Sequence, residues 1–231
     1  MGATRTIDNR AELISAAERL FATRGIDGVS LREINRSAGQ KNNGALQYHF
    51  EGRAGLLQAI LDKHKRDVEI TRHALLEQFE TGSRTDPRPL VGAFILPLAA
   101  KLHDTSGGPE FLRIAAELVN RPDGDPATPD RAESLYRWTA LVEPFLPVGT
   151  VGAPLHRRLA AIRFVHVELG RRAMQIQRRN DQLFVSYLTD LTTSLLLGPV
   201  SSETQRLVKG RRQGQALTPR TTCHPGPRTD A

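Results

Sequence analysis

Apolar residues recur at helical spacing along almost the whole of this 231-residue chain. In the first segment, one predicted helix face carries Leu13, Ala16, Ala17, Leu20 and Phe21, at positions i, i+3, i+4, i+7 and i+8. No window sustains the alternation of apolar and polar residues that is typical of strands, and no Asn-Gly or Asp-Gly pair joins two β-rich runs. The pattern therefore predicts an all-α fold without internal repeats.

Glycines, prolines and polar clusters divide this pattern into about nine helices. Pro97 should kink the fifth helix, because proline lacks a backbone donor. The expected helices cover residues 8–24, 31–38, 43–49, 53–79, 90–103, 110–120, 131–145, 155–179 and 181–197.

A capping box marks the start of the second helix. The sequence from Ser30 to Glu33 reads Ser-Leu-Arg-Glu, so the Ser30 hydroxyl can accept a hydrogen bond from the Glu33 backbone N–H. The Glu33 carboxylate can in turn accept one from the Ser30 N–H. The face that carries Leu31, Ile34 and Ala38 is expected to be buried. The sequence therefore predicts a short amphipathic helix that begins here.

A glycine-containing turn separates this helix from the next. Gly39 ends the second helix, and a short polar turn leads into the brief third helix at residues 43–49. Two short helices joined by a tight turn, with a longer supporting helix before them, form a helix-turn-helix pattern. Residues 1–52 are therefore predicted to form a DNA-binding domain, and residues 53–198 a larger helical domain.

The net charge of the chain is weaker evidence for a DNA partner than the helix-turn-helix pattern. The formal net charge is +7, of which residues 1–50 contribute +2, residues 51–198 +1 and residues 199–231 +4. The last segment is rich in proline and glycine and poor in large apolar groups after Val208, so it cannot bury enough surface to offset its ordering entropy. We expect a disordered basic tail there, with at most a short helical turn near residues 203–208. A basic tail alone is weak support for a nucleic-acid partner.

Composition excludes several other classes. The longest apolar run, residues 90–100, is well short of the roughly 20 residues that span a bilayer, so we expect no membrane partner. Charged residues near the N-terminus, Arg5, Asp8, Arg10 and Glu12, interrupt any signal peptide. The single cysteine, Cys223, allows neither an intrachain disulfide nor a cysteine zinc site, which suits a reducing cytoplasm.

Enzyme motifs are likewise missing from the sequence. It contains no G-x-S-x-G, G-x-x-x-x-G-K-[ST], H-E-x-x-H or G-x-G-x-x-G pattern, and its seven histidines lack metal-ligand spacing. We expect neither catalysis, nor a metal, nor a cofactor. Two alternatives to a DNA-binding protein stay open: an all-helical enzyme without a recognisable motif, and a helical adaptor that uses its basic tail on membranes or RNA.

The residue types at the entry of the third helix suit the reading of base edges. A recognition helix presents its first turn to the major groove, where Asn and Gln can bond bidentately to adenine and Lys to guanine. This chemistry is supplied by Lys41, Asn42, Asn43 and Gln47. Asn42 would serve equally as an N-cap. The other contact candidates are Gln40 in the turn and the small residues Gly44 and Ala45, which permit close approach to a phosphate or a thymine methyl group.

Side chains around the turn are also placed for phosphate contacts. The candidates are Ser30 and Arg32 on the second helix, Tyr48 and His49 on the third, and Arg53 on the fourth. Helix N-terminal N–H groups would assist them. Tyr48 could instead be a half-buried core aromatic, and for His49 the two interpretations are evenly balanced. Leu46 and Phe50 are assigned to the core, and Arg19 and Arg24 to the solvated face of the first helix.

An ordered set of residues extends over about residues 8–58: Ala16-Ala17, Leu20-Phe21, Gly25, Ser30 to Ile34, Ala38-Gly39, Gly44 to Phe50, Arg53 and Leu56-Leu57. Together they resemble the tetracycline-repressor (TetR) family of bacterial transcription regulators. The sequence is similar to one subgroup of this family. The motif of that subgroup reads, in order, Ala-Gly-Gln, a Lys or Arg, Asn-Asn, a small residue, Ala, an apolar residue and Gln-Tyr-His-Phe. It has one residue more than the common pattern between Gly39 and Phe50, and Gln47 where many members carry an aromatic residue. Base contacts of other members are therefore not transferred.

The resemblance implies a homodimer formed by the two C-terminal helices. Their apolar residues are Leu159, Ile162, Phe164, Val165, Val167, Leu169, Leu183, Phe184, Tyr187, Leu188, Leu191, Leu195 and Leu196. A two-fold dimer would place two recognition helices about 34 Å apart and so predicts a palindromic DNA operator. The alternative is that these stripes are intrachain core only.

The resemblance also implies an effector pocket among the helices between residues 90 and 179. The candidate lining residues are Phe94, Leu98, Phe111, Leu112, Trp138, Leu141, Phe145 and Phe164, with His103 or His166 as polar anchors. Each could instead be plain core. Their apolar character indicates a hydrophobic or aromatic effector. The expected function is that of a cytoplasmic repressor that binds a palindromic operator and is released by this effector.

Overall fold

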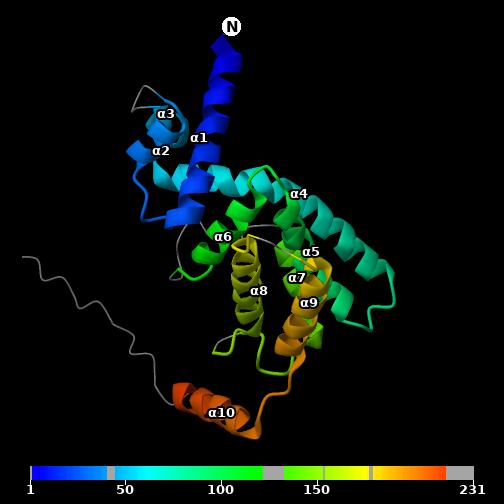
Figure 1. Cartoon of the computed structure of the whole chain (residues 1–231). Helices are drawn as coiled ribbons and strands as arrows, with labels where there is room; N and C mark the ends of the chain where they lie inside the picture. Colours follow the sequence, from blue (N-terminus) through cyan, green and yellow to red (C-terminus); the bar gives the residue numbers. More distant parts are fainter. Residues whose placement is uncertain (1, 41–44, 122–132, 153, 177–178, 217–231) are drawn as a thin grey trace, which may run out of the picture.

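The computed structural model describes residues 2–40, 45–121, 133–152, 154–176 and 179–216, and its regular secondary structure within these ranges is entirely helical (Figure 1). This confirms the all-α prediction. The elements in chain order are α1 (Gly2–Arg24), α2 (Leu31–Ser37), α3 (Ala45–Phe50), α4 (Arg53–Thr81), α5 (Arg88–Ala99), the 3-10 helix η1 (Ala100–His103), α6 (Gly108–Leu118), α7 (Glu133–Val142), the 3-10 helix η2 (Glu143–Phe145), α8 (Arg157–Ala173), α9 (Asp181–Leu197) and α10 (Ser202–Ala216).

The first three helices form one packed unit. The predicted stripe of α1 faces its interior, where Leu13, Ala16, Ala17 and Phe21 are buried. The guanidinium of Arg10 on α1 lies over the ring of Phe50 on α3, 5.1 Å from the centroid. α1 begins at Gly2 rather than near Asp8, because no proline interrupts the residues between them.

α4 leaves this unit and runs across the upper side of the remaining helices (Figure 1). Its buried residues recur at helical spacing and include Leu56, Leu57, Ile60, Leu61, His64 and Val68. The unit and the body also meet at α6, where both carboxylate oxygens of Glu117 accept a hydrogen bond from the Ile26 N–H at 3.1 Å. α4 and α6 therefore both position the first three helices.

The body is built around α5, α7 and α8. Trp138 of α7 is fully buried, and its indole N–H donates to the Leu90 carbonyl at 2.9 Å. Pro97 does not end α5, which continues to Ala99 and then tightens into η1. The expected single helix over residues 90–103 is thus an α-helix followed by one 3-10 turn. The expected helices at 110–120 and 131–145 differ from α6, α7 and η2 by a few residues at their ends, and residues 131 and 132 lie outside the described part of the chain.

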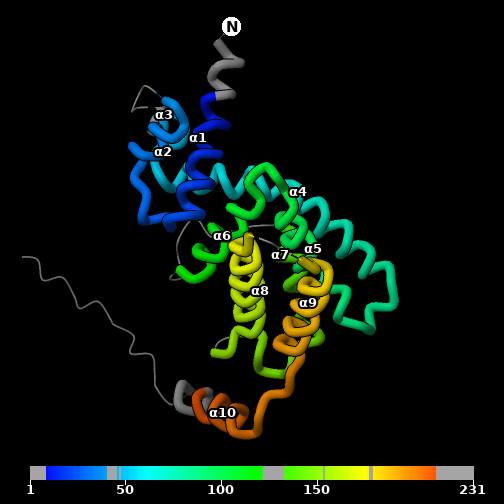
Figure 2. The backbone as a smooth tube through the Cα atoms, viewed as in Figure 1, coloured from blue at the N-terminus to red at the C-terminus, as the bar shows by residue number. Residues whose placement is uncertain are grey.

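The last two body helices lie side by side (Figure 2). α9 has the predicted bounds, whereas α8 is shorter than the expected 155–179. The guanidinium of Arg172 donates to the Arg179 carbonyl and, at 2.7 Å, to Asp181 at the start of α9. These bonds hold a turn that the apolar pattern does not reveal, and they account for the early end of α8.

The prediction of a disordered tail from residue 199 is wrong for residues 202–216, which form α10. The Ser201 hydroxyl accepts a hydrogen bond from the Thr204 N–H at 3.2 Å, and the segment that follows lacks proline and contains several good helix formers. Pro199 precedes α10, the other tail prolines, Pro219, Pro225 and Pro227, come after it, and residues 217–231 lie outside the described residues.

No single helix in the described ranges is long and apolar enough to cross a membrane. α9 and residues Ser202–Arg211 meet the length and composition criterion only as a pair, and the two are bent by 52° at the break between them.

Candidate DNA-binding face and ligand pocket

The start of α2 has the predicted capping box. The Ser30 N–H donates to a Glu33 carboxylate oxygen at 2.8 Å, and the Glu33 N–H donates to the Ser30 hydroxyl at 3.3 Å. The hydrogen bond from the Ser30 backbone, then that from its hydroxyl and that from Arg24, lower the pKa of Glu33 from 4.5 to about 2. Arg24 is exposed, as the sequence suggests, and its guanidinium also forms an ion pair with this carboxylate at 2.7 Å.

The turn after α2 is held by backbone geometry. Gly39 has φ of +67°, a left-handed conformation that favours glycine, and the Gln40 N–H donates to the Asn35 carbonyl at 3.0 Å. The Gln40 side-chain amide lies 3.4 Å from oxygens of Asn9, Glu12 and Ala38. Gln40 therefore links the turn to α1, a structural contact that differs from its predicted role towards DNA.

α3 separates its core residues from its exposed ones. Leu46 and Phe50 are buried, which confirms their assignment to the core. Tyr48 is 82% exposed, so the alternative of a half-buried core aromatic is wrong. His49 is half-buried, with its ring centroid 5.1 Å from that of Tyr48. Arg32 and Ser30 are exposed on α2 and just before it. Lys41, Asn42, Asn43 and Gly44 lie outside the described residues, as do the side chains of Ala45 and Gln47.

Arg53 is engaged within the fold. Its guanidinium donates to the carbonyls of Ile26 and Val29, the latter at 2.6 Å, and lies 5.7 Å from the ring centroid of Phe21. Arg53 therefore joins α4 to the loop between α1 and α2, and the phosphate contact expected from its place at the start of α4 stays a prediction. Sequence order hides this role because the two carbonyls lie more than twenty residues earlier.

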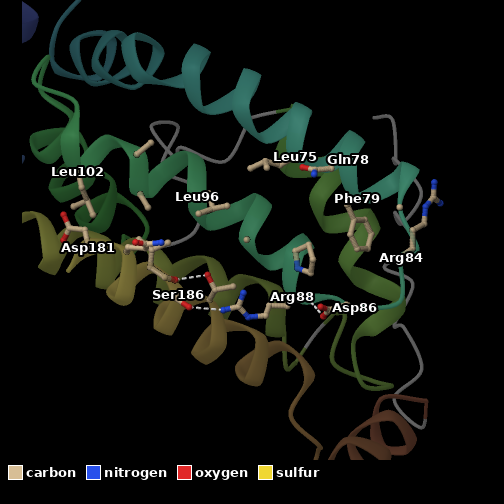
Figure 3. A pocket seen from close by; sticks show the side chains of 18 of the residues that line it. Leu75, Gln78, Phe79, Arg84, Asp86, Arg88, Leu96, Leu102, Asp181 and Ser186 are labelled. Atoms are coloured by element: carbon tan, nitrogen blue, oxygen red, sulfur yellow. Dashed lines mark hydrogen bonds between the residues drawn. The ribbon is translucent and has the colours of Figure 1, made fainter. Parts of the chain in front are cut away.

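A pocket of about 880 Å³ opens between the C-terminal half of α4, α5 with η1, and α9 (Figure 3). Its apolar wall includes Leu75, Phe79, Leu96, Leu102 and Val185. In Figure 3, Leu75, Gln78 and Phe79 come from α4 on one side, and Asp181 and Ser186 from α9 on the other.

Most charged groups of the pocket have partners. Arg88 lies 2.8 Å from Asp190 and donates to the Ser186 hydroxyl at 3.1 Å. At the other end, His103 lies 3.2 Å from Asp181, which also pairs with Arg172 at 2.6 Å. These paired charges and the apolar wall favour an apolar molecule with polar but uncharged groups.

Only His103 of the predicted pocket residues lines this space. Phe94, Leu98, Phe111, Leu112 and Trp138 are buried in the core, and Leu141, Phe145 and Phe164 pack against it. His166 is buried and lies 2.9 Å from the Ile162 carbonyl. The Phe94 and Trp138 rings are 4.8 Å apart and fill the interior where the family resemblance implied an effector pocket. The pocket residues from α4 and α9 were missed because they approach α5 only in the folded chain.

Residues 13–60 match the family described as bacterial regulatory proteins, tetR family. The HTH-type transcriptional regulator LmrA of Bacillus subtilis is 30% identical over 139 residues, which cover 59% of this chain and 70% of LmrA. This chain belongs to the tetR family.

This tetR-family chain is also similar to a second regulator in sequence and to a solved structure in fold. The HTH-type transcriptional regulator TtgR of Pseudomonas putida is 36% identical over 80 residues, and the match spans 35% of this chain but only 36% of TtgR. The structure of a tetR family transcription regulator from a Shewanella species has a TM-score of 0.52 at 16% identity, with 82% of this chain and 96% of that one covered. The family resemblance is thereby confirmed, whereas the subgroup motif stays a prediction.

Membership of the tetR family favours a transcriptional regulator over the helical enzyme and the adaptor. In the part of the chain that the structure describes, no group of three or more His, Cys, Asp or Glu side chains could hold a metal ion.

Proposed function

We propose that this tetR-family protein is a ligand-responsive repressor of transcription in the cytoplasm, with residues 1–52 as its DNA-binding domain and residues 53–198 as its effector and dimerisation domain. It binds a palindromic double-stranded DNA operator as a homodimer and is released by a small hydrophobic effector. The helix-turn-helix arrangement of α2 and α3, together with the family match over residues 13–60, carries the proposal.

The contact face proposed for DNA is the outer side of α2, the turn and α3. Burial of Leu46 and Phe50 fixes which side of α3 faces the core and leaves Tyr48 on the outside. Tyr48, His49 and Arg32 are proposed to contact phosphates. We assign the reading of base edges to Lys41, Asn42, Asn43 and Gln47, because these residue types can bond to adenine or guanine in the major groove.

The dimer interface is proposed on the outer faces of α8 and α9. On α9, Leu183 is 67% exposed and Tyr187 60% exposed, and Leu191 follows one turn later. Exposed apolar side chains at i, i+4 and i+8 form a stripe that water solvates poorly and that a second copy would cover. Burial of Leu188, Thr192 and Leu196 on the opposite face shows that the intrachain core does not use this stripe.

The effector is proposed to bind in the pocket between α4, α5 and α9. Its volume of about 880 Å³ lies within the usual range of roughly 300–1,000 Å³ for small-molecule sites. The apolar wall and the paired charges support a neutral, hydrophobic or aromatic ligand. Binding weakens the operator complex only to the extent that the ligand prefers the conformation that does not fit DNA.

Selection of bound sequences from random double-stranded DNA tests the proposal. We expect a palindrome whose half-sites lie about one helical turn apart, with affinity that falls steeply as salt concentration rises. Enrichment of no sequence, or equal binding to all sequences, would contradict it.

Gln47→Ala tests the assignment of base reading. The variant should lose preference at one base position of each half-site, at a cost of about 1–3 kcal/mol, because one bidentate contact is removed. Repeating the selection with the variant measures this change. An unchanged motif would show that Gln47 reads no base.

A further inference from the structure

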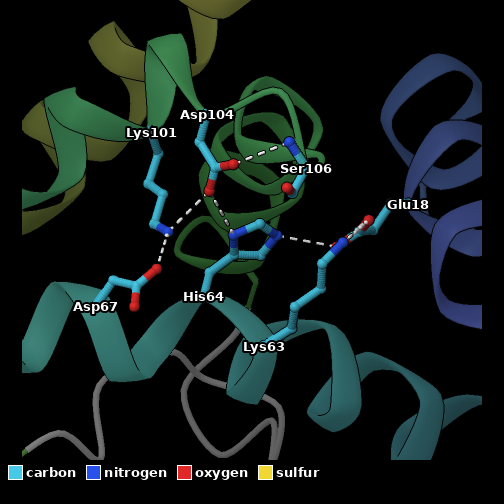
Figure 4. Close-up of polar contacts among 7 residues, drawn as sticks. All are labelled: Glu18, Lys63, His64, Asp67, Lys101, Asp104 and Ser106. Atoms are coloured by element: carbon cyan, nitrogen blue, oxygen red, sulfur yellow. Dashed lines mark hydrogen bonds and ion pairs between the residues drawn. The ribbon is translucent and has the colours of Figure 1, made fainter. Parts of the chain in front are cut away.

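We propose that a buried polar cluster between α1, α4 and η1 transmits occupation of the pocket to the DNA-binding helices. The cluster consists of the buried residues Glu18, His64 and Lys101, the half-buried Asp104, and Lys63 and Asp67 at its exposed edge (Figure 4). The inference rests on the proposed role of the pocket as the effector site.

The cluster begins on α1. Glu18 is 2% exposed, and its carboxylate accepts a hydrogen bond from Lys63 Nζ at 2.7 Å and lies 2.9 Å from His64 Nε2. The corner before α6 closes over this carboxylate: Gly107 has φ of +97°, and a Cβ there would come 2.5 Å from Glu18 Oε2. Glu18 therefore has little room to move independently of α4 and this corner.

His64 continues the cluster from α1 towards η1. It is 1% exposed, and its ring stacks on Phe111 of α6 with centroids 4.7 Å apart. Its Nδ1 lies 3.6 Å from Asp104 Oδ2, while Nε2 faces Glu18 (Figure 4). One rigid ring on α4 thus stands between a carboxylate of α1 and a carboxylate that follows η1.

Lys101 joins η1 to the cluster. It is 4% exposed, and its ammonium group donates to Asp104 at 2.9 Å and to Asp67 of α4 at 3.0 Å. Burial opposes the charged form, but the hydrogen bonds with Asp104 and Asp67 outweigh it, so the pKa of Lys101 is raised. The hydrogen bond from Lys101 in turn lowers the pKa of Asp104. Both groups are held in their charged forms by each other.

η1 has one side in the pocket and the other in the cluster. Ala100, Leu102 and His103 line the pocket, whereas the side chain of Lys101 between them points to Asp67 and Asp104. In a 3-10 turn residues three apart lie on the same side, so Ala100 and His103 move together against a ligand. A ligand that displaces this wall must also displace the backbone of Lys101.

Displacement of Lys101 has a large effect because Lys101, His64 and Glu18 are buried, although Asp67 is exposed. Removal of one partner from a buried ion pair leaves the other charge uncompensated, so the cluster favours discrete arrangements over small continuous shifts. When Lys101 moves, Asp104, His64 and Glu18 must find new partners together. A new position of Glu18 is a new position of α1, and therefore of α2 and α3.

A tethered occupant tests the connection without knowledge of the natural effector. Gln182 is exposed on α9, lines the pocket and lies next to Asp181, which contacts His103. In a chain that carries Cys223→Ser, Gln182→Cys is labelled with benzyl methanethiosulfonate, which places a benzyl group in the pocket opposite η1. Gln205→Cys, an exposed position on α10 outside the pocket lining, is the matched control.

Two measurements follow labelling. Amide hydrogen exchange of α1 around Glu18, with no DNA present, should become faster, and affinity for the selected operator should fall about 5- to 150-fold, the usual range of coupling between two sites. Labelling of the Gln205→Cys control should change neither the exchange of α1 nor the affinity for the operator. Because the exchange measurement needs no DNA, a protein that fails to bind DNA would overturn the proposed function and leave this inference to be decided by exchange alone.

Variants of the cluster decide whether it carries the effect. Lys101→Met combined with Asp104→Asn removes the pair without leaving a buried charge on either residue, and labelling should then change neither α1 exchange nor operator affinity. Lys101→Arg, which keeps the charge, should retain the effect. Glu117→Gln weakens a separate hydrogen-bonded contact, between α6 and Ile26 in the loop after α1, and should also retain it.

Two outcomes would overturn the inference. If labelling in the pocket leaves α1 exchange unchanged in the otherwise intact chain, the pocket is not coupled to α1. If the effect persists in the double variant, another path carries it. If circular dichroism shows that the double variant does not fold, His64→Gln replaces it, because this variant interrupts the cluster between Asp104 and Glu18. Loss of the labelling effect in His64→Gln would then support the inference, and its persistence would overturn it.

Discussion

Glu33 shows how one side chain organises the entry to the helix-turn-helix. Its carboxylate accepts from the Ser30 N–H and the Ser30 hydroxyl and pairs with Arg24 at the end of α1. These contacts favour the charged form, which is why the pKa of Glu33 falls to about 2. One residue thus caps α2 and connects it to α1.

The lowered pKa of Glu33 predicts a pH dependence of stability. Because the folded-state pKa is about 2 and the ordinary value is 4.5, the contribution of the carboxylate is present above pH 4.5 and is lost as pH falls towards 2. Glu33→Gln should remove this contribution. Urea unfolding of both proteins should therefore show a difference in stability that is constant above pH 4.5 and shrinks below it. A difference that stays constant throughout would contradict the prediction.

Arg53 leads to a second prediction at this scale. Arg53→Ala removes the donors to the Ile26 and Val29 carbonyls and should lower the free energy of unfolding by about 1.5–3 kcal/mol, as measured by urea unfolding. Arg19→Ala, at an exposed position of α1, should have little effect.

Salt dependence separates this structural role from a phosphate contact. Arg53→Ala should leave the slope of log affinity against log salt unchanged, whereas Arg32→Ala should reduce it by about 0.9 for each phosphate that the protein then leaves unneutralised. A reduced slope for Arg53→Ala would show that Arg53 contacts a DNA phosphate.

At the scale of elements, Gly170 allows α8 to approach α6 closely. A Cβ at this position would lie 2.5 Å from the Ala116 Cβ and 3.2 Å from the Leu112 carbonyl oxygen. Because helix backbone cannot yield as a flexible side chain can, the two helices would have to separate. This contact supports the α6 segment that faces α1.

Gly170→Ala should therefore destabilise the protein by about 1–3 kcal/mol through overpacking, although alanine is the better helix former. Thermal unfolding followed by circular dichroism measures the effect. Gly152→Ala, where a Cβ would meet nothing within 4 Å, provides the control. If Gly170→Ala proved as stable as the control, the close approach would not constrain the helices.

The ends of the elements show where sequence prediction succeeds. The start of α2 and both ends of α9 were predicted, because caps and apolar spacing act within a few residues. The early end of α8 depends on Arg172, whose partners lie seven and nine residues further along. α10 is longer than the helical turn predicted near residues 203–208, because that prediction weighed a proline-free segment together with the proline-rich residues after it.

At the scale of the whole molecule, the exposed stripe of α9, formed by Leu183, Tyr187 and Leu191, is the reason to expect a dimer. Burial of one leucine side chain is worth about 1.5–3 kcal/mol, so a stripe of three such residues repeated on two copies can stabilise a dimer. The two-fold arrangement would also set the spacing between the two copies of α3, and therefore the spacing of operator half-sites.

Leu183→Glu together with Tyr187→Glu should convert a dimer into a monomer, because two charges would be buried without partners at the interface. Light scattering after gel filtration at micromolar concentration measures this. Ile70→Glu, which replaces an equally exposed apolar residue on α4, should leave the dimer intact. A monomeric unmodified protein would contradict the dimer, and a double variant that still dimerises would place the interface elsewhere.

The amino-acid sequence by itself determined the helical class, the capping box, the helix-turn-helix and the core residues of α3, since each depends on spacing or hydrogen bonds within a few positions. Only the tertiary structure decided which aromatic residues fill the core, where the pocket lies and what Arg53 contacts. The pocket brings α4 and α9 to α5, and the buried polar cluster brings Glu18 to His64 across 46 positions. Such contacts depend on how helices pack, and the periodicity of a single helix carries no information about its partner.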